Sequence, residues 1–150
     1  MDEIDLQILR LLEENGRLTH EEISRLLHIS RPTVHQRVSK LEKNGVIRGY
    51  RCVVDWRKLE QKIKALIFVK VKCQNYSELA GIVVELQIPG VTLLECQRLA
   101  GEWCMLLKVR VSAPEDITRL IDHLVKFPEI LETSTTFILS TILENEIKEI

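Results

Sequence analysis

The residues best suited to binding chemistry lie in one short stretch of the chain, residues 30–43. Gln36 can pair bidentately with adenine and Arg37 with guanine, while Thr33 can meet a base edge or the methyl group of thymine. Three cations suit phosphates, which set the register of a protein on a duplex without reading its sequence: Arg31, Lys40 and Lys43. The alternative for each residue is a solvated side chain on an ordinary surface helix.

Charge is distributed unevenly along the 150 residues, although the whole chain carries a net charge of only −1. Residues 1–22 hold seven acidic side chains against two basic ones, a net −5. Residues 31–58 hold eight basic side chains against two acidic ones, a net +6. Such a basic segment suits a phosphate backbone, because each neutralised phosphate releases counterions. A solvated charged face is the alternative, and charge alone leaves both open.

A helix over residues 31–43 would bring the candidate side chains together. Ser30 can cap it, Pro32 sits where a missing N–H costs nothing, and Asn44-Gly45 can stop it. Apolar residues at i, i+4 and i+7 form its expected buried side: Val34, Val38 and Leu41. A step of about 100° per residue turns another set outward, with Arg37 on the flank: Pro32, Thr33, Gln36, Lys40 and Lys43.

Two further helices are expected before this one. The first carries an apolar stripe and stops at Asn15-Gly16: Ile4, Ile8, Leu11 and Leu12. Thr19 can cap the second helix, and Glu22 can complete a capping box with it. The expected buried face of this helix has three residues: Ile23, Leu26 and Leu27. With the tight connection at residues 28–30, the three helices predict a helix-turn-helix.

The pattern changes after the third helix. Residues 46–54 read as extended structure, a wing-like strand leading out of the helical domain, and residues 55–59 as a linker. The domain boundary is therefore expected near residue 60, with a DNA-binding domain over 1–60 and a second domain over 61–150. Tyr50 and Trp56 could stack on bases, but we expect them to pack against the hinge.

The remaining residues alternate strand and helix patterns in the order β-α-β-β-α-β. The strands are expected over residues 63–73, 91–99, 103–111 and 130–143, and the helices over 76–87 and 114–127. This order predicts an α+β fold of the split βαβ type, an antiparallel sheet with two helices on one face. We expect the other face to pack against the sheet of a second subunit, because it would otherwise be exposed. A dimer also suits paired half-sites about one helical turn apart.

Taken in order, several motifs resemble the Lrp/AsnC family of bacterial and archaeal regulators, also called feast/famine regulatory proteins. They are the segments 2–9 and 14–17, the segment 38–50, the segment 106–109 after Gly101, and the segment 133–139. The resemblance implies a winged helix-turn-helix domain joined by a hinge strand to a ferredoxin-like βαββαβ regulatory domain. It also implies homodimers that assemble further, often to octamers, and that bind pseudo-palindromic double-stranded DNA.

Many family members bind an amino acid between dimers, which couples ligand binding to assembly or to DNA affinity. By position, the resemblance implies these effector-site residues: Leu99, Gly101, Glu102, Cys104, Thr133 and Thr135. Family members often carry Gly-Asp-Tyr-Asp where this chain has Gly101-Glu102-Trp103-Cys104. Cys104 supplies no carboxylate for the ammonium group of a ligand. The alternative is a turn and a Thr-rich strand that bind nothing.

Four functions fit the layout to different degrees. The main hypothesis is a sequence-specific transcriptional regulator modulated by an amino acid, and the second is an architectural DNA-binding protein without an effector. Haem-biosynthesis decarboxylases share the two-domain layout, but His123 is the only histidine of the second domain, so we expect no enzyme. A pure oligomerisation module would leave the +6 segment unexplained.

Cysteine and histidine spacing predicts no metal site and no cofactor. Cys52, Cys73, Cys96 and Cys104 form no C-x-x-C pair, and reduced thiols are expected. The longest apolar runs are too short to span a bilayer, and the chain opens with acidic residues. The sequence thus predicts a cytoplasmic, nucleoid-associated protein.

Overall fold

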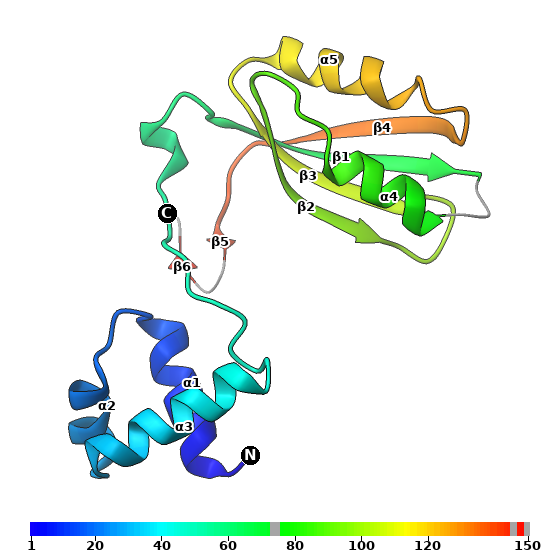
Figure 1. Ribbon diagram of the computed structural model, residues 1–150. Coiled ribbons are helices and arrows are strands. Elements are labelled where there is room, and N and C mark those ends of the chain that lie inside the picture. Colours follow the sequence, from blue (N-terminus) through cyan, green and yellow to red (C-terminus); the bar gives the residue numbers. More distant parts are fainter. Residues whose placement is uncertain (73–75, 145–146, 149–150) are drawn as a thin grey trace. The chain divides into compact units, whose positions relative to one another are not determined.

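The chain forms two compact units, Met1–Val54 and Asp55–Ile150 (Figure 1). The computed structural model describes residues 1–72, 76–144 and 147–148, with the side chains of 1–56, 58–72 and 76–142. In this described part, no helix is long and apolar enough to cross a membrane.

Three helices build the first unit: α1 (Glu3–Glu14), α2 (His20–Leu27) and α3 (Arg31–Lys43). Capping boxes begin the first two, Asp2 with Asp5 on α1 and Thr19 with Glu22 on α2. Ser30 caps α3. The predicted caps of α2 and α3 are confirmed, because a side-chain oxygen at these positions accepts the first unpaired backbone N–H groups of the helix.

Apolar side chains from the three helices meet in one core: Ile8, Ile23, Val34, Val38 and Leu41. Each is at most 5% exposed, which confirms the predicted buried side of α3. The expectation that Leu26 is buried was wrong, since it is 55% exposed. The eight-residue α2 turns Ile23 and Leu27 toward the core, and Leu26 lies a helical step of about 100° from Leu27.

The wing-like strand expected over residues 46–54 does not form. Between α3 and residue 63, all of whose backbone is described, the only regular element is a short 3-10 helix, η1 (Trp56–Lys58). A strand needs a second backbone to pair with, and no described segment offers one here. The segment is instead tied to α3: the N–H groups of Val46 and Ile47 donate to the carbonyl of Leu41. The Tyr50 hydroxyl donates to Glu42 Oε1 at 3.0 Å.

The second unit has the predicted order of elements. They are β1 (Ile63–Val71), α4 (Tyr76–Val84), β2 (Val91–Arg98), β3 (Met105–Val111), α5 (Pro114–Leu124) and β4 (Ile130–Ile138). The four strands form one sheet in the order β2-β3-β1-β4, and every neighbouring pair is antiparallel. This is the ferredoxin-like arrangement that was predicted.

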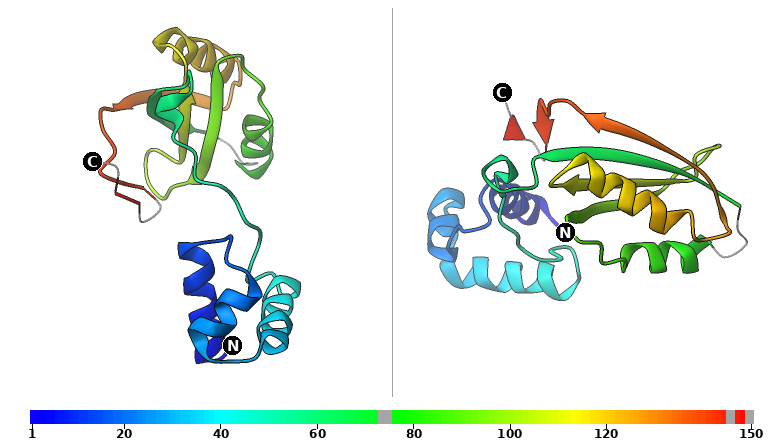
Figure 2. Two further views of the ribbon diagram at one scale, coloured as in Figure 1. Left: turned by 90° about the vertical axis from the view of Figure 1, so that its left-hand side faces the viewer. Right: turned by 90° about the horizontal axis from the view of Figure 1, so that it is seen from above.

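Both helices lie on one side of the sheet, as two further views show (Figure 2), and alternating residues of the central strands face them. From β1, Ala65, Ile67 and Val69 are fully buried, and from β3 so are Met105, Leu107, Val109 and Val111. Helix residues complete this core: Leu79, Val83, Ile117, Leu120 and Leu124. The period of two along the strands therefore decides which side of the sheet carries the helices.

The last expected strand, 130–143, is shorter than predicted. β4 pairs with β1 as far as Lys64 opposite Ile138, and β1 begins one residue earlier, at Ile63. Beyond that point no described strand pairs with β4. A separate two-stranded ribbon follows, made of β5 (Leu143–Glu144) and β6 (Ile147–Lys148).

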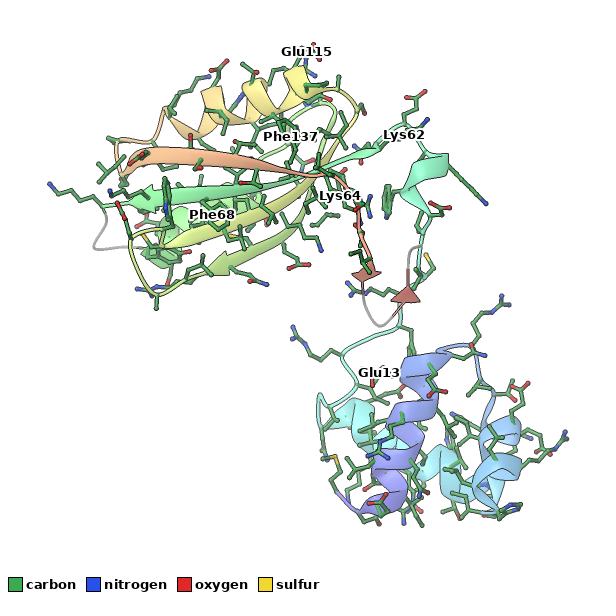
Figure 3. The ribbon with its side chains drawn as sticks, turned by 180° about the vertical axis from the view of Figure 1, so that it is seen from behind. Glu13, Lys62, Lys64, Phe68, Glu115 and Phe137 are labelled. Carbon is green, nitrogen blue, oxygen red and sulfur yellow. The ribbon has the colours of Figure 1, made fainter. Side chains whose placement is uncertain are left out.

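The face of the sheet away from the helices, called the open face below, is mixed in character (Figure 3). Strand register places Phe68 of β1 beside Leu106 of β3, and the Phe68 ring meets Trp103 edge-on at 6.4 Å between centroids. Toward the start of β1, Lys64 and Arg110 are neighbours and each is at most 7% exposed. Apolar rings and cations thus lie on one face.

Segments outside the sheet cover the cationic end of the open face. The Arg110 guanidinium lies over the Trp56 ring of η1, with Arg110 Cζ 5.4 Å from the centroid of that ring. Lys64 Nζ donates to Thr141 Oγ1 at 3.0 Å. Trp56 was expected to pack against the hinge, but the contact that its ring makes is with Arg110 on β3 of the second unit.

Candidate DNA-binding face and effector-site turn

The exposed side of α3 carries most of the predicted DNA-binding residues. Arg31, Gln36, Lys40 and Lys43 are all exposed; the last three lie on the side opposite the buried Val34, and Arg31 lies in the first turn of the helix. Among the described residues, none of these four side chains has a hydrogen bond or an ion pair. Their donors are therefore available to a ligand, and the helix itself is fixed by its core.

Ser30 and Thr33 are engaged with each other at the start of α3. Ser30 Oγ accepts the backbone N–H of Thr33 at 3.2 Å, and the two hydroxyl oxygens are 2.7 Å apart. This arrangement caps the helix and fixes both side chains. In either direction of the hydroxyl–hydroxyl bond, Thr33 Oγ1 keeps a lone pair that can accept a further hydrogen bond.

Arg37, predicted on the flank of the helix, is held by the first helix. Its Nη1 donates to Asp2 Oδ1 at 2.8 Å, to Asp2 Oδ2 at 2.7 Å and to Asp5 Oδ1 at 2.8 Å. The side chain is 26% exposed. The hydrogen bond from Arg37 lowers the pKa of Asp2, and the backbone N–H of Asp2 followed by Arg37 lowers the pKa of Asp5. The two carboxylates raise the pKa of Arg37.

Sequence reasoning missed this cluster of Asp2, Asp5 and Arg37. The capping signal was present, since Asp2-x-x-Asp5 before an apolar run has the spacing of a capping box. What the sequence does not show is that α1 and α3 cross so that this box meets a side chain 35 positions away.

A second contact beside α3 joins two histidines. The rings of His20, the first residue of α2, and His35 of α3 lie 5.3 Å apart and are tilted by 52°. His35 was expected to be a surface or packing residue, and it packs on the neighbouring helix.

In the second unit, Leu99, Gly101, Glu102 and Cys104 form one turn between β2 and β3. The Leu99 N–H donates to the Cys104 carbonyl at 2.9 Å and closes the turn. Gly101 has φ 127°, a conformation that L side chains rarely adopt. The Cys104 N–H donates to the Val69 carbonyl at 3.1 Å, and its Sγ lies 3.2 Å from the Val71 nitrogen.

Glu102 is paired across the turn with β1. Lys70 Nζ lies 2.6 Å from Glu102 Oε1 and 3.7 Å from Glu132 Oε2 on β4. The hydrogen bond from Lys70 lowers the pKa of Glu102, and Glu102 raises the pKa of Lys70. Sequence reasoning missed Lys70 and Glu132 as partners of Glu102.

The two threonines predicted for the effector site lie apart from this ion pair. Thr133 pairs with Val69 and Thr135 with Ile67, so both share the face of the sheet that the helices cover. Lys70, the partner of Glu102, alternates with Val69 and faces the other way. Within one chain, the predicted effector residues are thus divided between the two faces of the sheet.

Metal-binding and thiol chemistry have little support in the described part of the chain. It contains no cluster of three or more His, Cys, Asp or Glu side chains that could hold a metal ion. Cys52, Cys96 and Cys104 are free thiols as predicted, and burial raises the pKa of Cys96. Cys73 lies outside the described residues.

Family models match both units of the chain. Residues 1–48 match winged helix-turn-helix DNA-binding domains, and residues 64–147 match the Lrp/AsnC ligand binding domain. Among similar proteins, the HTH-type transcriptional regulator FL11 of Pyrococcus abyssi is 30% identical over 141 residues. That alignment covers 94% of this chain and 91% of FL11.

Solved structures agree with these matches. A transcriptional regulator from Neisseria meningitidis, in complex with L-Met, has a TM-score of 0.86 and 26% identity, covering 96% of this chain and 93% of that one. The structure of Bacillus subtilis LrpC has a TM-score of 0.77 and 30% identity, covering 95% and 96% respectively. The chain therefore belongs to the Lrp/AsnC family of DNA-binding transcriptional regulators.

Proposed function

We propose that this regulator reads a pseudo-palindromic operator with the exposed side of α3. One observation carries the proposal: Gln36 and three cations lie exposed and unengaged, among the described residues, on a helix anchored by its opposite side. Gln36 pairs with adenine and Thr33 meets a base edge or a thymine methyl. The cations bind phosphates and set register: Arg31, Lys40 and Lys43. Ser30 holds the first turn in place.

Selection from a random duplex library tests sequence reading. The full chain should enrich a motif with two related half-sites about one helical turn apart, at a stated salt concentration. An architectural protein would instead retain many duplexes without a common motif. Failure to enrich any motif at salt where binding persists would refute sequence-specific reading.

We also propose an amino-acid effector at the turn between β2 and β3, in an assembly of several subunits. The match to a ligand-binding domain and the L-Met complex of a similar regulator support this proposal. Within the turn, Glu102 supplies the carboxylate that can bind an ammonium group, because Cys104 cannot. Leu99 and Gly101 shape the turn, and a neighbouring subunit would have to bring Thr133 and Thr135 to the same ligand.

A thermal shift screen over the twenty amino acids tests the effector. A ligand at a hundred times its Kd that binds only the folded protein adds about 2.7 kcal/mol to the free energy of unfolding. The shift should be lost in Glu102→Gln. No shift for any amino acid would refute the effector and leave DNA reading untouched.

The open face of the sheet is proposed to bind the same face of a second copy. Phe68, Leu106 and Trp103 lie there among ion pairs such as Lys108 with Glu95, at 3.3 Å. An apolar centre with a charged rim is the usual anatomy of a protein interface. Such dimers are proposed to assemble further, to octamers.

Sedimentation velocity tests this interface. Phe68→Glu should convert the dimer to a monomer, since a charge would be buried at its centre. Phe137→Glu is the matched control, because Phe137 pairs with Ala65 on the helix-covered face and is 46% exposed. A dimer that survives Phe68→Glu would place the interface elsewhere.

Regulation, and no catalysis, is the activity we propose. The similar proteins named above are regulators, and a decarboxylase of the same layout is not favoured by them. We assign DNA binding to residues 1–60 and ligand binding and assembly to residues 61–150. A DNA-bound regulator of this kind would act in the cytoplasm, on the nucleoid.

A further inference from the structure

We propose that Arg37 is a positioning residue that seats α3 for DNA reading through Asp2 and Asp5, and that it does not read a base. This inference rests on the proposed DNA-reading function of α3. It assigns a role in operator binding to two acidic residues that carry the wrong charge to touch DNA.

The geometry joins one guanidinium nitrogen to both ends of a capping box. Arg37 Nη1 lies within 2.8 Å of Asp2 Oδ1, Asp2 Oδ2 and Asp5 Oδ1. Guanidinium–carboxylate bonds of this length are charge-assisted and stronger than neutral ones. The side chain therefore points along the flank of α3 toward α1.

The carboxylates are themselves fixed, so the contact can hold the helix. Asp2 Oδ1 accepts the Asp5 N–H at 3.0 Å, and Asp5 Oδ2 accepts the Asp2 N–H at 3.0 Å. Asp5 is only 9% exposed. Because both acids are bound to the backbone of α1, Arg37 ties α3 to a rigid helix end and not to two mobile side chains.

This tie adds a contact on the flank of α3, away from the side that the core holds. Val34, Val38 and Leu41 lie on one side of α3 and fix its depth, but they restrain rotation about the helix axis only through packing. A charged contact on the flank fixes that rotation and hence the direction of Gln36. Base contacts depend on such placement, because bidentate pairing has a narrow geometry.

The operator affinity of the double variant Asp2→Asn/Asp5→Asn tests the proposal, because charge repulsion and the positioning role predict changes in opposite directions. Asn keeps the cap and the size of each side chain while removing the charge. Removing two negative charges from a DNA-binding unit ordinarily strengthens binding, because repulsion of phosphates falls. The positioning role predicts the reverse, about fivefold weaker binding to every duplex tested, which is the size of a modest ion-pair network.

The experiment uses the full chain and a duplex that the wild-type protein has selected, with single base-pair variants of it. Arg37→Ala should weaken binding to all variants by a similar factor and leave the base preferences unchanged. Combining it with Asp2→Asn/Asp5→Asn should add nothing further, since all three residues act as one unit. Glu21→Gln is the matched control: it removes the carboxylate of an ion pair to Arg25 on α2 and should not weaken binding.

Three results would overturn the inference. They are unchanged or tighter binding by Asp2→Asn/Asp5→Asn, lost preference at one base pair in Arg37→Ala, and additive losses in the combination. Circular dichroism at the assay temperature gives the folded fraction of each variant, and the single substitutions Asp2→Asn and Asp5→Asn replace the double one if it unfolds. A wild-type protein that selects no duplex would refute the proposed function as well, whereas the results above leave it intact.

Discussion

The polar side chains of α3 differ in whether they are hydrogen-bonded to other residues of the protein. Gln36 and Lys40 extend from the helix with no partner among the described residues, whereas Arg37 donates to two carboxylates of α1. The residue types alone favour Arg37 and Gln36 equally as base readers, because guanidinium and amide groups both pair bidentately. The contacts separate them, because Arg37 is bound to Asp2 and Asp5, and this difference supports the proposal that Gln36 reads a base and Arg37 does not.

The paired carboxylates predict a loss of stability in acid. The folded protein lowers the pKa of Asp2 and Asp5 below their ordinary value of 3.8. Their contribution is therefore fully present above 3.8 and lost as the pH falls through the lower pKa of the folded state. The melting temperature of the wild type should exceed that of Asp2→Asn/Asp5→Asn near neutral pH, and the difference should shrink below about pH 4. A difference that is constant down to pH 2.5 would contradict this account.

At the scale of elements, the sequence correctly predicted the features that depend on residues close together in the chain. Ser30 and Pro32 located the start of α3, and Thr19 with Glu22 located the start of α2, because capping depends on residues within one turn. Pairing partners were not predictable in this way. Residues 46–54 have strand-forming side chains, but no described backbone pairs with them, and β4 stops where its antiparallel partner β1 begins. The same reasoning explains why the partners of Arg37 could not be foreseen.

Ser30 has a measurable share in the stability of α3. Ser30→Ala removes the oxygen that accepts the Thr33 N–H, and it should lower the free energy of unfolding by about 1 kcal/mol. Ser39→Ala lies inside the same helix and should change it by about 0.5 kcal/mol or less. Chemical denaturation of both variants makes the comparison. Equal effects of the two substitutions would show that Ser30 is not acting as a cap.

Gly90 is required where β2 begins. It has φ 82°, and a Cβ there would lie 2.5 Å from Asp116 Oδ2, which accepts the N–H groups of Ser112 and Ala113. Gly90→Ala should therefore cost about 1–3 kcal/mol of stability. Gly81→Ala on α4 is the matched control, because nothing lies within 4 Å of its added Cβ. It should be neutral or slightly stabilising, since Ala favours helix. Denaturant unfolding that ranks the two variants the other way would contradict this.

At the scale of the whole molecule, the chain separates recognition from regulation. The first unit has its own core around Ile8 and Val34, and the second has another around Ile67 and Leu107. The basic segment, residues 31–58, spans α3 and the linker. The net charge of −1 for the whole chain therefore includes a local net charge of +6 that suits DNA. The order of elements and the outward side of α3 followed from periodicity. The split of the effector residues between two sheet faces did not, because it depends on strand register.

The most direct test of DNA reading by α3 is the base preference of Gln36→Ala against that of the wild type. Affinities of both proteins are measured for a selected operator and its single base-pair variants at one salt concentration. The account predicts that discrimination falls by about 1–3 kcal/mol at one symmetric pair of positions and stays unchanged elsewhere. An unaltered preference at every position would contradict the claim that this side of α3 reads the operator.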